Sequence, residues 1–268
     1  MIGRIFAVAA NTRREAYRNR AFLVLILMGL TMTIIGIVLS KLAVRNQAVK
    51  VIQDFGYFSV SMVCAITAIL LGVILLHKEL DKKTIYTIVS KPIARFEIVL
   101  GKFLGLLTLL AVFVVGLTIP WMATLWMYDA LYVGGVAIWD DCLMGTFLMV
   151  GEAMVILSAA LLFSSWTRPF LAGIFTFGYF VMGKNMYLLR EYLSADTGPL
   201  SEAGPLRTIG QGFTYIVPDL DVFNVSREIS LGIDVHGSYV MSSFAYGVSF
   251  SMVFLCLSVF FFSRRDFM

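Results

Sequence analysis

Long apolar stretches alternate with short polar stretches along the whole chain. Six mostly apolar stretches, each close to or above 20 residues, are separated by segments that carry most of the charges. An α-helix of about 20 residues is long enough to cross about 30 Å of hydrocarbon. The pattern therefore predicts an all-α membrane protein with six transmembrane helices, at about 21–44, 55–76, 99–128, 142–165, 170–189 and 239–262.

Residues 2–19, ahead of the first predicted span, have the pattern of an amphipathic helix. Its apolar positions gather on one side of a helical projection, and arginines and other polar residues gather on the opposite side. A helix of this kind lies in the headgroup layer of a membrane, with its arginines among anionic lipids. We therefore expect an interfacial helix here; the alternative is a solvated leader that precedes the first span.

The segment between the second and third predicted spans, residues 78–97, combines many charges with an apolar stripe. Ile85, Ile88 and Val89 recur at helical spacing, so one face of a short helix outside the membrane is apolar. Pro92 ends this helix, because a proline disfavours helical geometry in the residue before it. An apolar face in that position is explained most simply if another protein covers it. The alternative is an ordinary positively charged loop.

Composition and charge fix the class and the orientation. Apolar residues make up 59% of the chain and charged residues only 14%, which excludes a sizeable soluble domain. Two thirds of the lysines and arginines fall on the side that six spans give to both termini. Positively charged loops stay in the cytoplasm. We therefore expect a multi-pass protein of the cell (inner) membrane with both termini cytoplasmic. Residues 190–237 would then form an external segment of short helices.

The sequence lacks several kinds of catalytic and binding site. It has no G-x-x-x-x-G-K-[ST] loop for ATP phosphates, so we expect that the chain is not itself an enzyme. His77 and His236 fall on opposite sides of the predicted membrane and cannot share a metal ion. The three cysteines have no metal-ligand or disulfide spacing. No metal, cofactor or nucleic acid is therefore expected on this chain.

Two features inside the predicted spans are candidates for a function. Glu152 is the one acidic residue well inside a span, and carboxylates within a membrane are costly and often functional. We expect it to line a pathway or a helix interface; the alternative is a carboxyl group hydrogen-bonded to a neighbouring helix. Gly101 and Gly105 form a G-x-x-x-G pattern that favours close packing of two helices.

The topology and one polar block resemble the ABC-2-type permeases. The block precedes the third predicted span and consists of Glu79, Asp81, Thr84, Ser90, Pro92, Arg95, Glu97, Gly101 and Lys102. The pair Ser164-Ser165 and the stretch from Pro218 to Asn224 are also similar to that family. The likeness covers nearly the whole chain. It is greatest for subfamilies with separate ATPase subunits, including the permease of nitrous-oxide reductase maturation.

This resemblance implies a fold, partners and docking residues. Residues 1–268 would form one transmembrane domain, and 78–97 would be the coupling helix that docks into an ATPase. The docking residues would be Glu79, Asp81, Thr84, Ile85, Ile88, Val89, Ser90, Lys91, Pro92 and Arg95. Two such permease subunits, identical or related, would pair with two ATPase chains. ATP and Mg would bind to the ATPase, and no cofactor would bind to this chain.

The resulting function is the membrane subunit of an ATP-driven exporter. An ion- or proton-coupled secondary transporter is the first alternative. Against it, only Glu152 and Lys184 are charged within the predicted spans apart from lysines close to span ends, and no inverted repeat is evident. A membrane anchor of a maturation or assembly complex is the second alternative.

Overall fold

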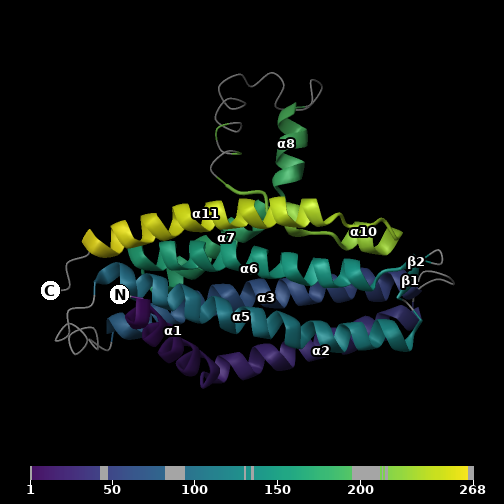
Figure 1. Ribbon diagram of the computed structural model, residues 1–268, viewed down its shortest axis with the longest axis horizontal. Helices are drawn as coiled ribbons and strands as arrows, with labels where there is room; N and C mark the ends of the chain where they lie inside the picture. The colour runs from purple at the N-terminus through teal and green to yellow at the C-terminus, as the bar shows by residue number, and fades with distance from the viewer. Residues whose placement is uncertain are drawn as a thin grey trace.

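Long parallel and antiparallel helices form the body of the protein. The computed structural model describes residues 2–42, 48–81, 94–129, 131–133, 136–194, 212, 214 and 217–264. Within these residues, five helices are long and apolar enough to cross a membrane: α2 (Arg20–Leu42), α3 (Ala48–Asp81), α5 (Arg95–Met127), α6 (Trp139–Trp166) and α11 (Gly237–Arg264). They run along the long axis of the molecule (Figure 1). The prediction of a helical multi-pass membrane protein is confirmed.

The two ends of this bundle differ. Helix α1 (Ile2–Tyr17) lies obliquely at one end, together with the C-terminal end of α11 (Figure 1). At the other end, strands β1 (Tyr132–Val133) and β2 (Val136–Ala137) pair antiparallel between α5 and α6. We call these the α1 end and the β1–β2 end. The orientation predicted from charge would put the α1 end in the cytoplasm.

Helix α6 is the centre of the bundle and α2 lies at its edge. In the most apolar 18-residue stretch of α6, 78% of the residues are buried, whereas the corresponding share in α2 is only 22%. Helix α11 packs on α6 through a face that carries small residues every fourth position, Ser243, Gly247 and Ser251. Small residues let two helix backbones approach closely, which favours packing of helices within lipid.

The expected fifth span, 170–189, differs from a single helix. Helix α7 (Pro169–Lys184) has 16 residues, which span about 24 Å, less than the hydrocarbon thickness. Helix α8 (Met186–Ser194) then turns away from the bundle (Figure 1). The backbone N–H of Leu220 donates to the carbonyl of Gly183, 3.0 Å away. A chain segment from far along the sequence therefore meets α7 where it ends.

That segment continues along the bundle beyond α7. It contains the 3₁₀ turn η1 (Asp221–Phe223) and the short helix α10 (Ser226–Leu231), which lies toward the β1–β2 end (Figure 1). Helices α7 and α10 both pack against α3 and α6. Phe223 is fully buried, and its ring contacts the positions of Gly151 on α6 and Gly247 on α11. Helix α7 and the η1–α10 segment therefore follow one another along the same side of α3 and α6, where a single continuous span would otherwise lie.

Candidate functional site

A buried ion pair lies at the point where α7 ends. Glu152, near the middle of α6, is only 3% exposed. One of its carboxylate oxygens, Oε1, lies 2.9 Å from the ammonium nitrogen of Lys184, the last residue of α7. The other oxygen, Oε2, accepts a hydrogen bond of 3.0 Å from the hydroxyl of Ser61 on α3. The carboxylate therefore joins three helices.

The energetics of this pair make it sensitive to change. A charge buried alone costs several kcal/mol, and a partner with good geometry offsets that cost. Lys184 also lies at the C-terminal end of α7, where the helix dipole favours a positive charge. The carboxylate of Glu152 and the dipole of α7 therefore both stabilise the positive charge of Lys184 where it lies.

A pocket of about 420 Å³ opens beside the ion pair. Its walls come from α3, from the end of α7 and from the η1 segment. Phe58, Met62 and Phe180 give apolar walls, and Lys184 and Asp221 give charged groups. Backbone that is not helical is tolerated at membrane depth where it lines a cavity or packs on protein. A broken helix with charged groups beside a cavity is the arrangement that membrane transporters use for polar ligands.

Hydrogen bonds from the spans hold the η1 segment in place. The hydroxyl of Tyr57 on α3 donates to the carbonyl of Phe223, 3.0 Å away. The hydroxyl of Ser226 donates to the Oδ1 of Asp54 on α3 at 3.2 Å. Asp219 forms an ion pair of 3.1 Å with Arg190 of α8. Among the described residues, no group of three or more His, Cys, Asp or Glu side chains is placed to hold a metal ion.

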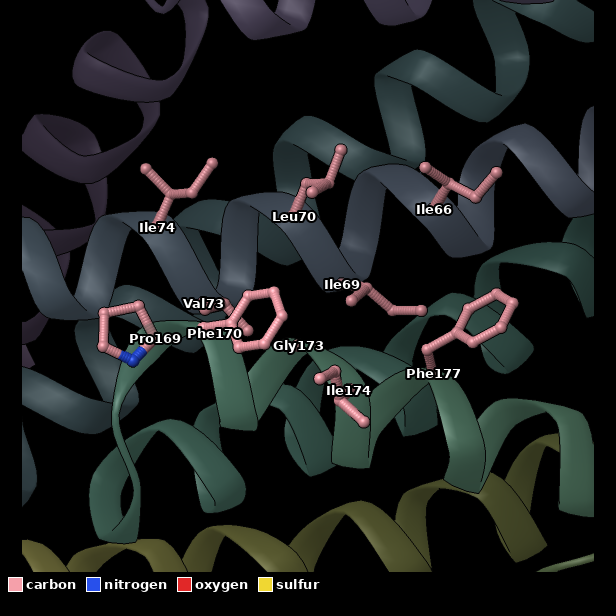
Figure 2. Close-up of a pocket in the computed structure, with 10 residues that line it drawn as sticks. All are labelled: Ile66, Ile69, Leu70, Val73, Ile74, Pro169, Phe170, Gly173, Ile174 and Phe177. Carbon is pink, nitrogen blue, oxygen red and sulfur yellow. The ribbon is translucent and has the colours of Figure 1, made fainter.

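A second, apolar groove runs between α3 and α7 on the outside of the bundle. It encloses about 500 Å³. Figure 2 shows Phe170, Ile174 and Phe177 of α7 on one side, and Ile69 and Val73 of α3 on the other. Phe170 is 79% exposed, so this face of α7 has no partner within the described part of the chain. It is a surface that lipid or another protein would cover.

Most of the predicted docking residues lie outside the described residues. The backbone of Glu79 and Asp81 forms the last turn of α3, and Arg95 begins α5. Thr84, Ile85, Ile88, Val89, Ser90, Lys91 and Pro92 fall within 82–93, which the structure does not describe. Their docking role stays a prediction.

The two helices that flank 82–93 are tied to each other. The ammonium group of Lys102 on α5 donates to the carbonyl of Leu75 on α3 at 2.8 Å, and Lys102 is only 1% exposed. At the start of α5, the Glu97 carboxylate accepts from the backbone N–H of Ala94 at 3.2 Å, which caps the helix. A force applied to the segment between α3 and α5 would therefore reach both spans.

Gly101 and Gly105 are the residues through which α5 meets α1. A methyl group added at Gly105 would lie 2.5 Å from the carbonyl oxygen of Ala9 and 3.0 Å from its Cα. A methyl group at Gly101 would lie 2.6 Å from the Cβ of Val8. The two helices therefore touch backbone to backbone, which only glycine permits at these two positions.

The comparison with known families identifies the chain. The sequence model of the family described as "ABC-2 family transporter protein" matches residues 7–267, which is nearly the whole chain. The chain belongs to the ABC-2 transporter family. No individual curated protein matches it. Members of this family are membrane permease subunits that work with an ABC ATPase.

Two buried contacts of this ABC-2 permease are not predicted by its sequence. Lys184 was recognised as a charge near the end of a span, but nothing in the pattern paired it with Glu152. Lys102 belongs to the polar block before the third predicted span, and nothing in the sequence indicates that the fold buries it against α3. Both contacts join residues that are 27 or more positions apart, and local periodicity carries no signal over that distance.

Proposed function

We propose that this ABC-2 permease is the membrane-spanning subunit of an ATP-driven exporter. Two permease subunits, identical or related, form the pathway, and two separate ATPase chains bind ATP and Mg and supply the energy. The permease itself hydrolyses nothing. Its resemblance to the permease of nitrous-oxide reductase maturation favours a subfamily in which the ATPase is a separate chain. The complex lies in the inner membrane with both termini of the permease in the cytoplasm.

The observation that carries this proposal is the tie between α3 and α5. Lys102 holds the two helices together within about three helical turns of residues 82–93, the segment expected to dock on the ATPase. Movement of a docked ATPase would therefore move two spans as one unit. Each state must be favoured by different contacts, so the segment must bind the nucleotide-bound and nucleotide-free ATPases differently.

The broken row of α7 and the η1 segment supports a pathway through this side of the bundle. The pocket of about 420 Å³ beside Glu152 and Lys184 supplies polar groups for a solute. The apolar groove between α3 and α7 supplies a surface for the second permease subunit. In this proposal α7 is the fifth of six spans, completed toward the outside by the η1–α10 segment.

The test replaces the apolar stripe of the docking segment. A buried Ile side chain contributes about 1.5–3 kcal/mol to binding, whereas an exposed ion pair contributes under about 1 kcal/mol. Ile85→Asp with Ile88→Asp should abolish binding of the ATPase, and Lys91→Ala, the control, should weaken it only slightly. Co-purification and substrate-stimulated ATP hydrolysis are the measurements. Normal binding and normal coupled hydrolysis in the double variant would remove the docking role.

A proton-coupled secondary transporter is the second candidate, favoured by the buried carboxylate of Glu152. A carboxylate that carries protons must exchange them during each cycle. Glu152→Gln keeps the shape of the side chain and removes the charge. Transport by this variant that stays at the wild-type level over a broad pH range would exclude the second candidate. Transport that needs no ATPase in the wild type, and that is lost in Glu152→Gln, would favour it.

A further inference from the structure

A groove at the junction of α1 and α5 has basic walls and an apolar floor. It encloses about 440 Å³. Arg13 and Arg14 line it from the end of α1, Arg18 lines it just after that helix, and Leu109 and Val112 line it from α5. Tyr17 completes the wall on α1. We call it the arginine groove.

The arginines of this groove are available to bind an anionic ligand. All three are exposed, and no carboxylate lines the groove. In the described part of the chain, none of the three forms an ion pair. An arginine guanidinium presents a planar set of N–H donors that fits a phosphate group in a two-point contact. The groove is therefore suited to a phosphate or similar anion.

The position of the groove says what kind of anion it takes. Helix α1 ends at Tyr17 and the apolar helix α2 begins at Arg20, so the arginines lie where polar chain passes into a membrane span. Val112 on the floor is 71% exposed and belongs to α5, another membrane span. A ligand in this groove would have its phosphate among the arginines and a chain of apolar carbons against α5.

We propose that the arginine groove is a binding site for one anionic phospholipid. The phosphate lies between Arg13, Arg14 and Arg18, and one acyl chain follows the surface of Leu109 and Val112. A zwitterionic headgroup fits less well, because its positive group would lie among the arginines. The site is independent of the ATPase and of the pathway. It would fix α1 against α5 from the lipid side, in addition to the glycine contacts at Gly101 and Gly105.

The experiment measures lipid retention on the purified full-length permease by native mass spectrometry. Phosphatidylglycerol and phosphatidylcholine with the same acyl chains are added in parallel. Wild type should retain phosphatidylglycerol and little phosphatidylcholine. The variant Arg13→Gln/Arg14→Gln/Arg18→Gln should bind phosphatidylglycerol at least about tenfold more weakly. Arg20→Gln removes one charge at the same end but outside the groove, and should bind as wild type does.

Two further arms keep the test decisive. Val112→Trp fills the floor without changing the charge, and should weaken the lipid but not inorganic phosphate. Glycerol 3-phosphate tests whether a free phosphate compound alone is the ligand. Equal retention of the two lipids, unchanged retention in the triple variant, or displacement of the lipid by glycerol 3-phosphate at matching concentration would each overturn the proposal. If the triple variant does not fold, Arg14→Gln alone should give a smaller loss, and wild-type retention there contradicts the site.

Discussion

The contact between α1 and α5 and the junction between α7 and the η1 segment both attach a short element to long spans, but by different chemistry. At the first, Gly105 lies directly against the backbone of Ala9, and Gly101 lies against the side chain of Val8. At the second, the ion pair of Lys184 with Glu152 holds the end of α7, and hydrogen bonds to Tyr57 and Asp54 of α3 hold the segment. The first contact should therefore be sensitive to added volume, and the second to loss of a polar partner.

This difference follows from the surroundings of each element. Helix α1 lies beside a complete span and needs only a close fit, which dispersion forces and small residues supply. The η1 segment stands where a membrane span would have continued, so its backbone groups need partners that lipid cannot provide. Side-chain hydroxyl groups of α3 and α11 supply part of that need: Tyr57 donates to the carbonyl of Phe223, and Tyr239 donates to that of Val222.

The largest effect is expected from removing Lys184. Lys184→Met leaves the carboxylate of Glu152 buried without its partner, which should lower the free energy of unfolding by about 3–5 kcal/mol. Thermal unfolding in nanodiscs measures the loss. The double variant Glu152→Gln/Lys184→Met should regain most of it, because no charge is then buried alone. Arg190→Met, at a pair whose arginine is half exposed, is the control and should cost under about 1 kcal/mol. An equal loss in both single variants would contradict the special role of the Glu152 pair.

A smaller but selective effect is expected at Gly105. Gly105→Ala places a methyl group against the backbone of Ala9, and overpacking of this kind costs about 1–3 kcal/mol. Gly116 lies on the same helix with no atom within 4 Å of an added methyl, so Gly116→Ala should be neutral or gain up to about 1 kcal/mol of helix propensity. Thermal unfolding and disulfide cross-linking between α1 and α5 report the two outcomes. Identical behaviour of the two variants would mean that α1 does not pack on Gly105.

The smallest effect is expected from Tyr57→Phe. The change removes the hydroxyl that donates to the carbonyl of Phe223 and keeps the ring. Loss of one buried hydrogen bond costs about 1 kcal/mol. Hydrogen exchange at the amides around Val225 should speed up, whereas exchange in α6 should not change. Tyr187→Phe on the exposed face of α8 is the matched control. Faster exchange in the control as well would point to a general loosening rather than to this contact.

Much of the fold was predicted from the sequence alone. The expected first span, 21–44, corresponds to α2 at Arg20–Leu42, and the last, 239–262, corresponds to α11 at Gly237–Arg264. Such agreement is expected, because an apolar run of this length has few alternatives to a helix in lipid. The interfacial position of α1 could be proposed from its stripe, but its partner α5 could not, since a G-x-x-x-G pattern does not say which helix it meets.

The candidate site was predicted only in part. Glu152 was singled out because a carboxylate is rare within an apolar run. Its partner was missed, and so was the end of α7, because Met186, Leu188 and Leu189 continue the apolar pattern past Lys184. What meets α7 at its end is Leu220 on a distant segment and Glu152 on another helix.

The sequence by itself determined that this chain is a helical membrane protein and where most of its spans lie. Its segregated apolar runs must satisfy their backbone groups internally, and only a helix does that within one segment. The tertiary structure alone decided where α7 stops, which charges pair and which helix covers the two glycines. Those outcomes depend on contacts between residues far apart in the chain, whose free energies appear only when the helices are packed together.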